Sequence, residues 1–107
     1  MQHTITAINP WTLSEIEVNI QVWQILPSGY GHKEVTFKVD HPDHQFEDGY
    51  KFNVTSTDIE LFDEAKEMSY DEGNQLIIDN LIGDSTEIAM EIGEWIQRVN
   101  EKYEEEA

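Results

Sequence analysis

The residues best suited to chemistry lie in one short polar segment, Asp40-His41-Pro42-Asp43-His44. Imidazole and carboxylate groups together form a recurring ligand set for zinc, manganese, iron and nickel. The two histidines stand three positions apart, so both rings could reach one ion from a loop. A catalytic site needs a third protein ligand, and the sequence identifies none. We therefore predict a polar turn without a metal or other cofactor. A small metal-dependent enzyme that uses the His41–His44 loop is the alternative.

Carboxylates recur at helical spacing in two segments of the second half of the chain. The first set shares one face of a predicted helix at 58–68, at positions i, i+3, i+4 and i+7: Glu60, Asp63, Glu64 and Glu67. The second set follows a predicted terminal helix over about 21 Å, at 1.5 Å per residue: Glu87, Glu91, Glu94 and Glu101. Acid–base catalysis requires carboxyl groups whose environments separate their pKa values, and exposed stripes do not provide them. We therefore predict no enzymatic activity from these acids.

The two acidic stripes instead favour binding. Like charges four residues apart weaken a helix by a few tenths of a kcal/mol per pair. Among the acids of the terminal helix, only Glu94 has a base four positions later, Arg98. Uncompensated negative charge suits attachment to a basic surface, such as the Lys and Arg that a nucleic-acid-binding protein presents to phosphates. The predicted partner-binding residues are Glu60, Asp63, Glu64, Glu67, Glu87, Glu91 and Glu94, with Trp11 as an exposed aromatic anchor outside the stripes.

We expect a non-enzymatic acidic protein that binds and neutralises a basic partner, a nuclease or another nucleic-acid-handling protein. In composition the chain is similar to the DNA mimics, acidic inhibitors from phages and mobile elements, and to immunity proteins that block toxic nucleases. It carries no motif of one particular family. Two other interpretations stay open: an assembly subunit whose sheet edge pairs with a partner, and an acidic surface that only solvates the protein. The oligomeric state is not predicted.

The charge of the chain restricts its partners. Its 107 residues include 23 acidic and 6 basic ones, which gives a net charge of −17. Direct binding to nucleic acid or to an anionic membrane is therefore disfavoured. The chain has no cysteine, no visible secretory signal, and no apolar run near the roughly 20 residues that cross a membrane. We expect a cytoplasmic protein.

The apolar pattern predicts one α+β domain over 1–107, with strands mainly in 1–55 and helices in 57–107. Short alternating runs predict four strands of an antiparallel sheet, near 3–7, 16–22, 35–39 and 50–54. The alternation changes phase at Trp23, which predicts either a β-bulge or a strand end covered on both faces. Polar residues alternate with the apolar ones at 15–21, so we expect the outer face of the sheet to be open.

The second half predicts helices on the other face, in the order ββββααα. Thr57 and Glu60 have capping-box spacing, so a helix should begin at Asp58. We predict a turn at 69–74 and a short helix at 75–82, with a buried strand as the alternative. With Asp84 as N-cap, an amphipathic helix with an acidic tail should follow. Its predicted apolar stripe is Ile88, Ile92, Trp95, Ile96, Val99 and Tyr103.

Overall fold

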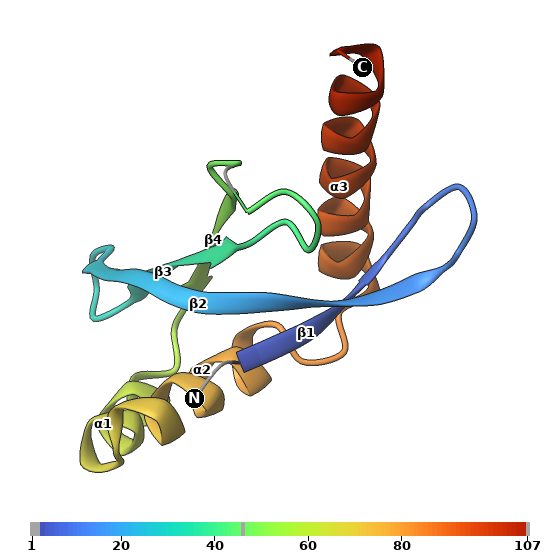
Figure 1. Ribbon diagram of the computed structural model, residues 1–107. Helices are drawn as coiled ribbons and strands as arrows, with labels where there is room; N and C mark the ends of the chain where they lie inside the picture. The colour runs from blue at the N-terminus through green and yellow to red at the C-terminus, as the bar shows by residue number, and fades with distance from the viewer. Residues whose placement is uncertain (1–2, 46, 107) are drawn as a thin grey trace.

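Four antiparallel strands are followed by three helices, which is the predicted α+β order ββββααα (Figure 1). The computed structural model describes residues 3–45 and 47–106. The strands are β1 (His3–Ile8), β2 (Glu15–Pro27), β3 (Lys33–Val39) and β4 (Tyr50–Ser56). The helices are α1 (Ile59–Glu67), α2 (Tyr70–Leu81) and α3 (Thr86–Glu106).

The sheet is a meander in which each strand pairs with its neighbour in sequence, in the order β1-β2-β3-β4. Side chains of directly paired residues lie on the same face of a sheet. The register therefore places the alternating apolar residues of all four strands on one face, through pairs such as Ile5–Val18, Ile20–Val39 and Phe37–Phe52. On the opposite face Glu17, Asn19 and Gln21 are exposed, as the alternation predicted.

A β-bulge interrupts β2 where the sequence changes phase. The β2–β3 register shifts between Val22 and Gln24, so Trp23 is the extra residue, and of the two predicted alternatives the bulge is the one present. Beyond the bulge Ile25 pairs with Val35, which returns an apolar side chain to the covered face.

All three helices contribute to one hydrophobic core on the apolar face of the sheet. The strands supply Ala7, Val18, Ile20, Val35, Phe37 and Val39. The second half of the chain supplies Phe62, Ile77, Ile78, Ile82, Ile92 and Ile96. Full burial of one such aliphatic or aromatic side chain contributes roughly 1.5–3 kcal/mol. This shared core fixes where each helix lies on the sheet.

Helix α1 begins one residue later than predicted. Asp58 is its N-cap and not its first residue, because its carboxylate accepts a hydrogen bond from the Leu61 amide at 3.1 Å. Leu61 and Phe62 are buried, whereas Ile59 is 51% exposed. The apolar side of α1 is therefore narrower than its sequence indicates.

Helix α2 shows that the predicted turn at 69–74 is wrong. The Ser69 hydroxyl accepts from the Glu72 amide at 3.3 Å and caps a helix that begins at Tyr70 and includes 75–81. Gly73-Asn74 has the composition of a turn, but Gly73 is buried where α2 meets α1. A Cβ at Gly73 would lie 2.6 Å from the Ala65 carbonyl oxygen, so the glycine permits close packing of the two helices.

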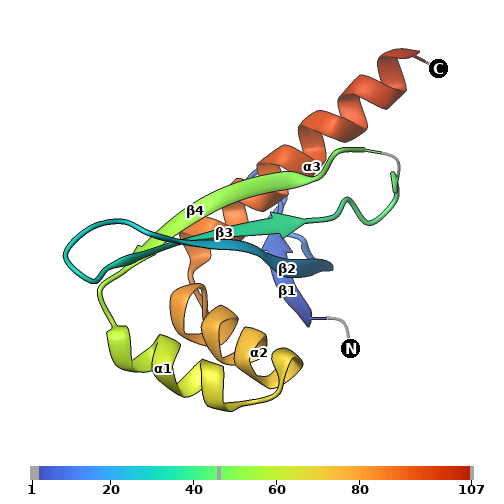
Figure 2. The same cartoon turned by 90° about the vertical axis from the view of Figure 1, so that its left-hand side faces the viewer.

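Helix α3 begins at Thr86, because Ser85 and not Asp84 caps it. The Ser85 hydroxyl accepts from the Ile88 amide at 3.3 Å. The predicted apolar stripe is confirmed: Ile92, Ile96 and Val99 are buried, and Ile88, Trp95 and Tyr103 are partly buried. The helix packs on β1 near its start, and its C-terminal part projects away from the sheet (Figures 1 and 2).

Candidate protein-binding surface

The outward side of α3 carries the three acids of this helix that the sequence assigned to partner binding, Glu87, Glu91 and Glu94, and also Glu101. Glu87, Glu91 and Glu101 are exposed, whereas Glu94 is partly buried. Glu94 forms an ion pair with Arg98 one turn later, as their spacing indicated. The other three acids have no basic partner among the described residues. This side of α3 therefore presents uncompensated negative charge.

The field of these acids reaches the end of the sheet. Tyr50 of β4 packs against Trp95 of α3, with ring centroids 5.7 Å apart. Burial raises the pKa of the Tyr50 hydroxyl, and the charges of Glu91 and Glu94 raise it further against the opposing effect of Arg98. At the Tyr50 hydroxyl, the charges of Glu91 and Glu94 thus outweigh that of Arg98.

The acidic stripe of α1 lies elsewhere on the molecule. Its members are all exposed: Glu60, Asp63, Glu64 and Glu67. Helix α1 packs on α2 at one end of the sheet, and α3 rises from the other end (Figures 1 and 2). The structure therefore does not join the two predicted stripes into one surface.

The loop that carries Trp11 adjoins α3. Trp11 belongs to the loop between β1 and β2 and is 65% exposed, as predicted for an anchor. The side-chain amide of Asn9, at the start of this loop, donates to Gln97 Oε1 of α3 at 3.5 Å. The preceding strand end also touches α3, since a Cβ at Gly93 would lie 1.9 Å from the Ile8 carbonyl oxygen. Trp11 and the acids of α3 thus belong to one end of the molecule.

Aromatic rings dock the loop between β3 and β4 onto α3, which the sequence did not predict. His44 stacks on Tyr103 with ring centroids 3.9 Å apart, and His41 packs edge-on against Trp95 at 5.6 Å. The Tyr103 hydroxyl donates to Glu47 Oε2 at 3.1 Å. Tyr103 is therefore not a residue of the sheet core; it holds the loop against the projecting part of α3.

His41 shapes this loop from the inside. It is 4% exposed, and its Nδ1 accepts hydrogen bonds from the Asp43 amide at 3.0 Å and the His44 amide at 3.1 Å. Burial lowers the pKa of His41, and His44 adds to the effect. The Ile96 carbonyl, Asn100 and Asp43 oppose it. The polar turn expected here is present, and the His41 imidazole caps it.

The metal alternative depends on the same two histidines. Because Nδ1 of His41 already accepts two amide hydrogen bonds, its lone pair is not offered to an ion. Its Nε2 is buried and has no hydrogen-bond partner among the described residues. Within 3–45 and 47–106, no three His, Asp or Glu side chains gather as a metal site requires. The geometry thus gives His41 a structural role in the turn.

Two lysines cover Trp23 on the outer face of the sheet. The ammonium groups of Lys38 and Lys51 lie 4.8 Å and 4.4 Å from its ring centroid. Trp23 is 49% exposed, so it belongs to the surface and not to the core.

Sequence reasoning did not single out two more aromatic residues that are highly exposed, Tyr30 and Tyr70.

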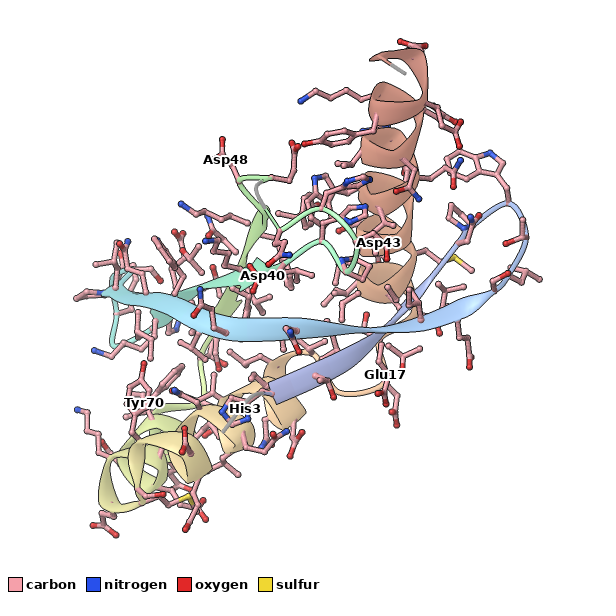
Figure 3. All side chains as sticks on the ribbon, in the orientation of Figure 1. His3, Glu17, Asp40, Asp43, Asp48 and Tyr70 are labelled. Atoms are coloured by element: carbon pink, nitrogen blue, oxygen red, sulfur yellow. The ribbon has the colours of Figure 1, made fainter. Side chains whose placement is uncertain are left out.

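Carboxylates of the first half of the chain extend the acidic surface. Figure 3 shows Glu17 on β2, and Asp40 and Asp43 on the loop that follows β3. These three acids line a hollow of about 580 Å³ together with His41 and Asn19. The negative surface is therefore not confined to the helices.

Comparison with known proteins assigns no family to the chain: no family model, no curated protein and no solved structure matches it. In the part of the chain that the structure describes, every helix is too short or too polar to cross a membrane. The function must therefore be inferred from the chemistry of the surface.

Proposed function

We propose that this chain is a non-enzymatic acidic inhibitor that binds a basic, nucleic-acid-handling protein and occupies its nucleic-acid-binding surface. The leading form is a DNA-mimic-like inhibitor of a host nuclease or defence protein, from a phage or a mobile element. An immunity protein for a toxic nuclease is the close second. The observation that carries the proposal is the row of exposed, unpaired carboxylates on α3: Glu87, Glu91 and Glu101.

The spacing of these acids suits a surface that holds phosphates. From Glu87 to Glu101 the helix rises about 21 Å, at 1.5 Å per residue. One strand of duplex DNA covers that length with about six nucleotides, at 3.4 Å each. A rigid helix also presents its carboxylates without the ordering cost that a flexible acidic segment pays on binding.

The shape of the molecule makes this row accessible. The C-terminal part of α3 projects from the sheet (Figure 2), and the β3–β4 loop holds it through the His44–Tyr103 stack and the hydrogen bond from Tyr103 to Glu47. A supported, protruding helix fits a cleft that normally admits a nucleic-acid strand. The net charge of −17 would speed the encounter with a basic cleft.

The test is charge reversal with a matched control. In one variant Glu87, Glu91 and Glu101 become Lys; in the control Glu60, Asp63 and Glu64 of α1 become Lys, which is the same change of charge at the other end of the molecule. Proteins retained from a lysate of cells that carry the gene, or of their host, are identified, and the basic ones are purified as probes. The α3 variant should lose most binding, and the α1 variant should keep most of it at physiological salt. Equal binding by both variants and the parent would refute the proposal.

A further inference from the structure

We propose that the loop at 9–14 is a preformed apolar anchor, which inserts Trp11 and Leu13 into an apolar pocket beside the basic surface of the partner protein. This inference rests on the proposed function and adds an apolar contact to the interface that the acids of α3 form. It also defines the partner further, as a protein in which an apolar pocket borders the basic cleft.

Two large apolar side chains are exposed together at this loop. Trp11 and Leu13 are each 65% exposed, and Ile16 at the start of β2 is 42% exposed. Ile16 also lines a hollow of about 270 Å³ with Gly93 and Ile96 at the base of α3. Scattered exposed apolar residues need no explanation, but tryptophan is among the residue types most enriched in interface hot spots.

Hydrogen bonds fix the backbone that carries these side chains. Asn9 Oδ1 accepts from the amides of Trp11 at 2.9 Å and Thr12 at 3.2 Å. The Asn9 amide donates to the Ser14 carbonyl at 2.9 Å, and the Leu13 amide donates to the Asn9 carbonyl at 2.7 Å. The hydroxyls of Thr12 and Ser14 lie 2.9 Å apart. A loop fixed before binding loses little entropy when it binds.

The backbone conformation of Leu13 also supports a binding role for this loop. Its φ of 63° lies in the left-handed region, which non-glycine residues rarely adopt. Glycine would fit there without strain, yet the chain places an exposed leucine at this position. Strained backbone of this kind costs stability in the free protein. Tyr30 has a similar φ of 53° at the other end of β2, but of the two loops only the one that carries Leu13 adjoins α3.

Position and charge identify the occupant as a protein with a basic rim. The anchor adjoins α3 through the Asn9–Gln97 hydrogen bond and the close approach of Ile8 to Gly93. Glu15 and Glu17, which follow the loop, are exposed acids. An apolar centre with acids around it complements an apolar pocket with Lys and Arg around it.

The experiment measures rates with the basic protein, purified as above, as the probe. Trp11→Ala, Leu13→Gly and their double variant are compared with Tyr30→Ala. Tyr30 is a matched control because it is 99% exposed, has a φ of 53°, and lies in the loop at the other end of β2. Leu13→Gly suits the left-handed backbone, so it removes the side chain and should melt no lower than the parent.

The anchor should act on dissociation, and the acids of α3 on association. In the double variant the dissociation rate should rise at least tenfold, and the association rate and its salt dependence should change less than twofold. Tyr30→Ala should match the parent. Retention of a protein does not by itself support the anchor. If the double variant dissociates like Tyr30→Ala while charge reversal on α3 abolishes binding, the anchor is refuted and the proposed function stands. If charge reversal on α3 has no effect, or the parent retains no basic protein, the anchor and the proposed function are both refuted.

Discussion

The rings of His44 and Tyr103 stack nearly parallel, with centroids 3.9 Å apart and planes inclined by 8°. This contact joins the loop between β3 and β4 to the part of α3 that projects beyond the sheet. Tyr103 also donates to Glu47, and Lys102 lies 3.7 Å from the same carboxylate. The projecting part of α3 is thus supported by side chains of a loop more than fifty residues earlier in the chain.

His44→Ala should loosen this support without unfolding the protein. Aromatic pairs contribute about 0.5–1.5 kcal/mol beyond the area that they bury. For a chain of this length, 1 kcal/mol corresponds to roughly 4–8 °C in melting temperature. The variant should melt lower by about that amount, and amide hydrogens of α3 after Val99 should exchange faster. His32→Ala is the control, since His32 lies in the loop at the opposite end of β3. Equal melting of both variants would show that the stack contributes nothing to stability.

His41 should make stability depend on pH. In the folded chain the pKa of His41 is lowered below the ordinary value of 6.5, mainly by burial. As the pH falls below 6.5, the unfolded chain therefore binds a proton at His41 before the folded chain does. The contribution of His41 is fully present above about pH 6.5 and is lost as the pH falls toward the folded pKa. The titratable groups that act on His41 are Asp43 and His44 of the loop, and the polar groups are the Ile96 carbonyl and Asn100 of α3.

The measurement for His41 is a comparison with His41→Asn in urea. An Asn oxygen can still accept the Asp43 and His44 amides, so the turn should persist. Between pH 7.5 and 5.5 the free energy of unfolding of the parent should fall relative to that of the variant. The difference between the two chains cancels the effect of the many carboxylates. Parallel curves would contradict the role assigned to the buried imidazole.

Alternation and helical period were enough to predict the sheet, the irregularity at Trp23 and the apolar stripe of α3, because each depends on residues near in sequence. Helix ends were predicted less well, since Ser69 and Ser85 compete with other polar residues nearby for the capping position. The roles of Gly73 and Gly93 could not be predicted, because each glycine is required by the close approach of a carbonyl oxygen from another element of the fold. The candidate surface follows the same rule: the helical spacing predicted each acidic stripe, but only tertiary packing separates α1 from α3 and brings the Trp11 loop to α3.

Gly93→Ala should be among the most damaging single changes in the chain. An added Cβ would meet the Ile8 carbonyl oxygen at 1.9 Å, and backbone atoms cannot yield as a flexible side chain can. Helix α3 must then move off β1, and the nearby core contacts of Ile92 and Ile96 are lost. Overpacking of this kind costs typically 1–3 kcal/mol or more. Thermal and urea denaturation should show this loss, with Met90→Ala as a control on the same helix. An unchanged stability would mean that α3 does not approach β1 this closely.

The melting temperature should rise with added NaCl. The molecule measures 47 × 25 × 22 Å and carries a net charge of −17. At 0.01 M salt the Debye length is about 30 Å, so most of its charges repel one another; at 0.15 M it is about 8 Å, and only neighbours interact. Repulsion among the acids therefore weakens as salt is added, and the free energy of unfolding increases. Scanning calorimetry between these two salt concentrations measures the change. The variant with Glu60, Asp63 and Glu64 changed to Lys should show a shallower rise, because its net charge is −11 by the replacement of three acids with three bases in the sequence. A flat curve for the parent would show that its acids are already compensated, and the inference from uncompensated charge to partner binding would lose its basis.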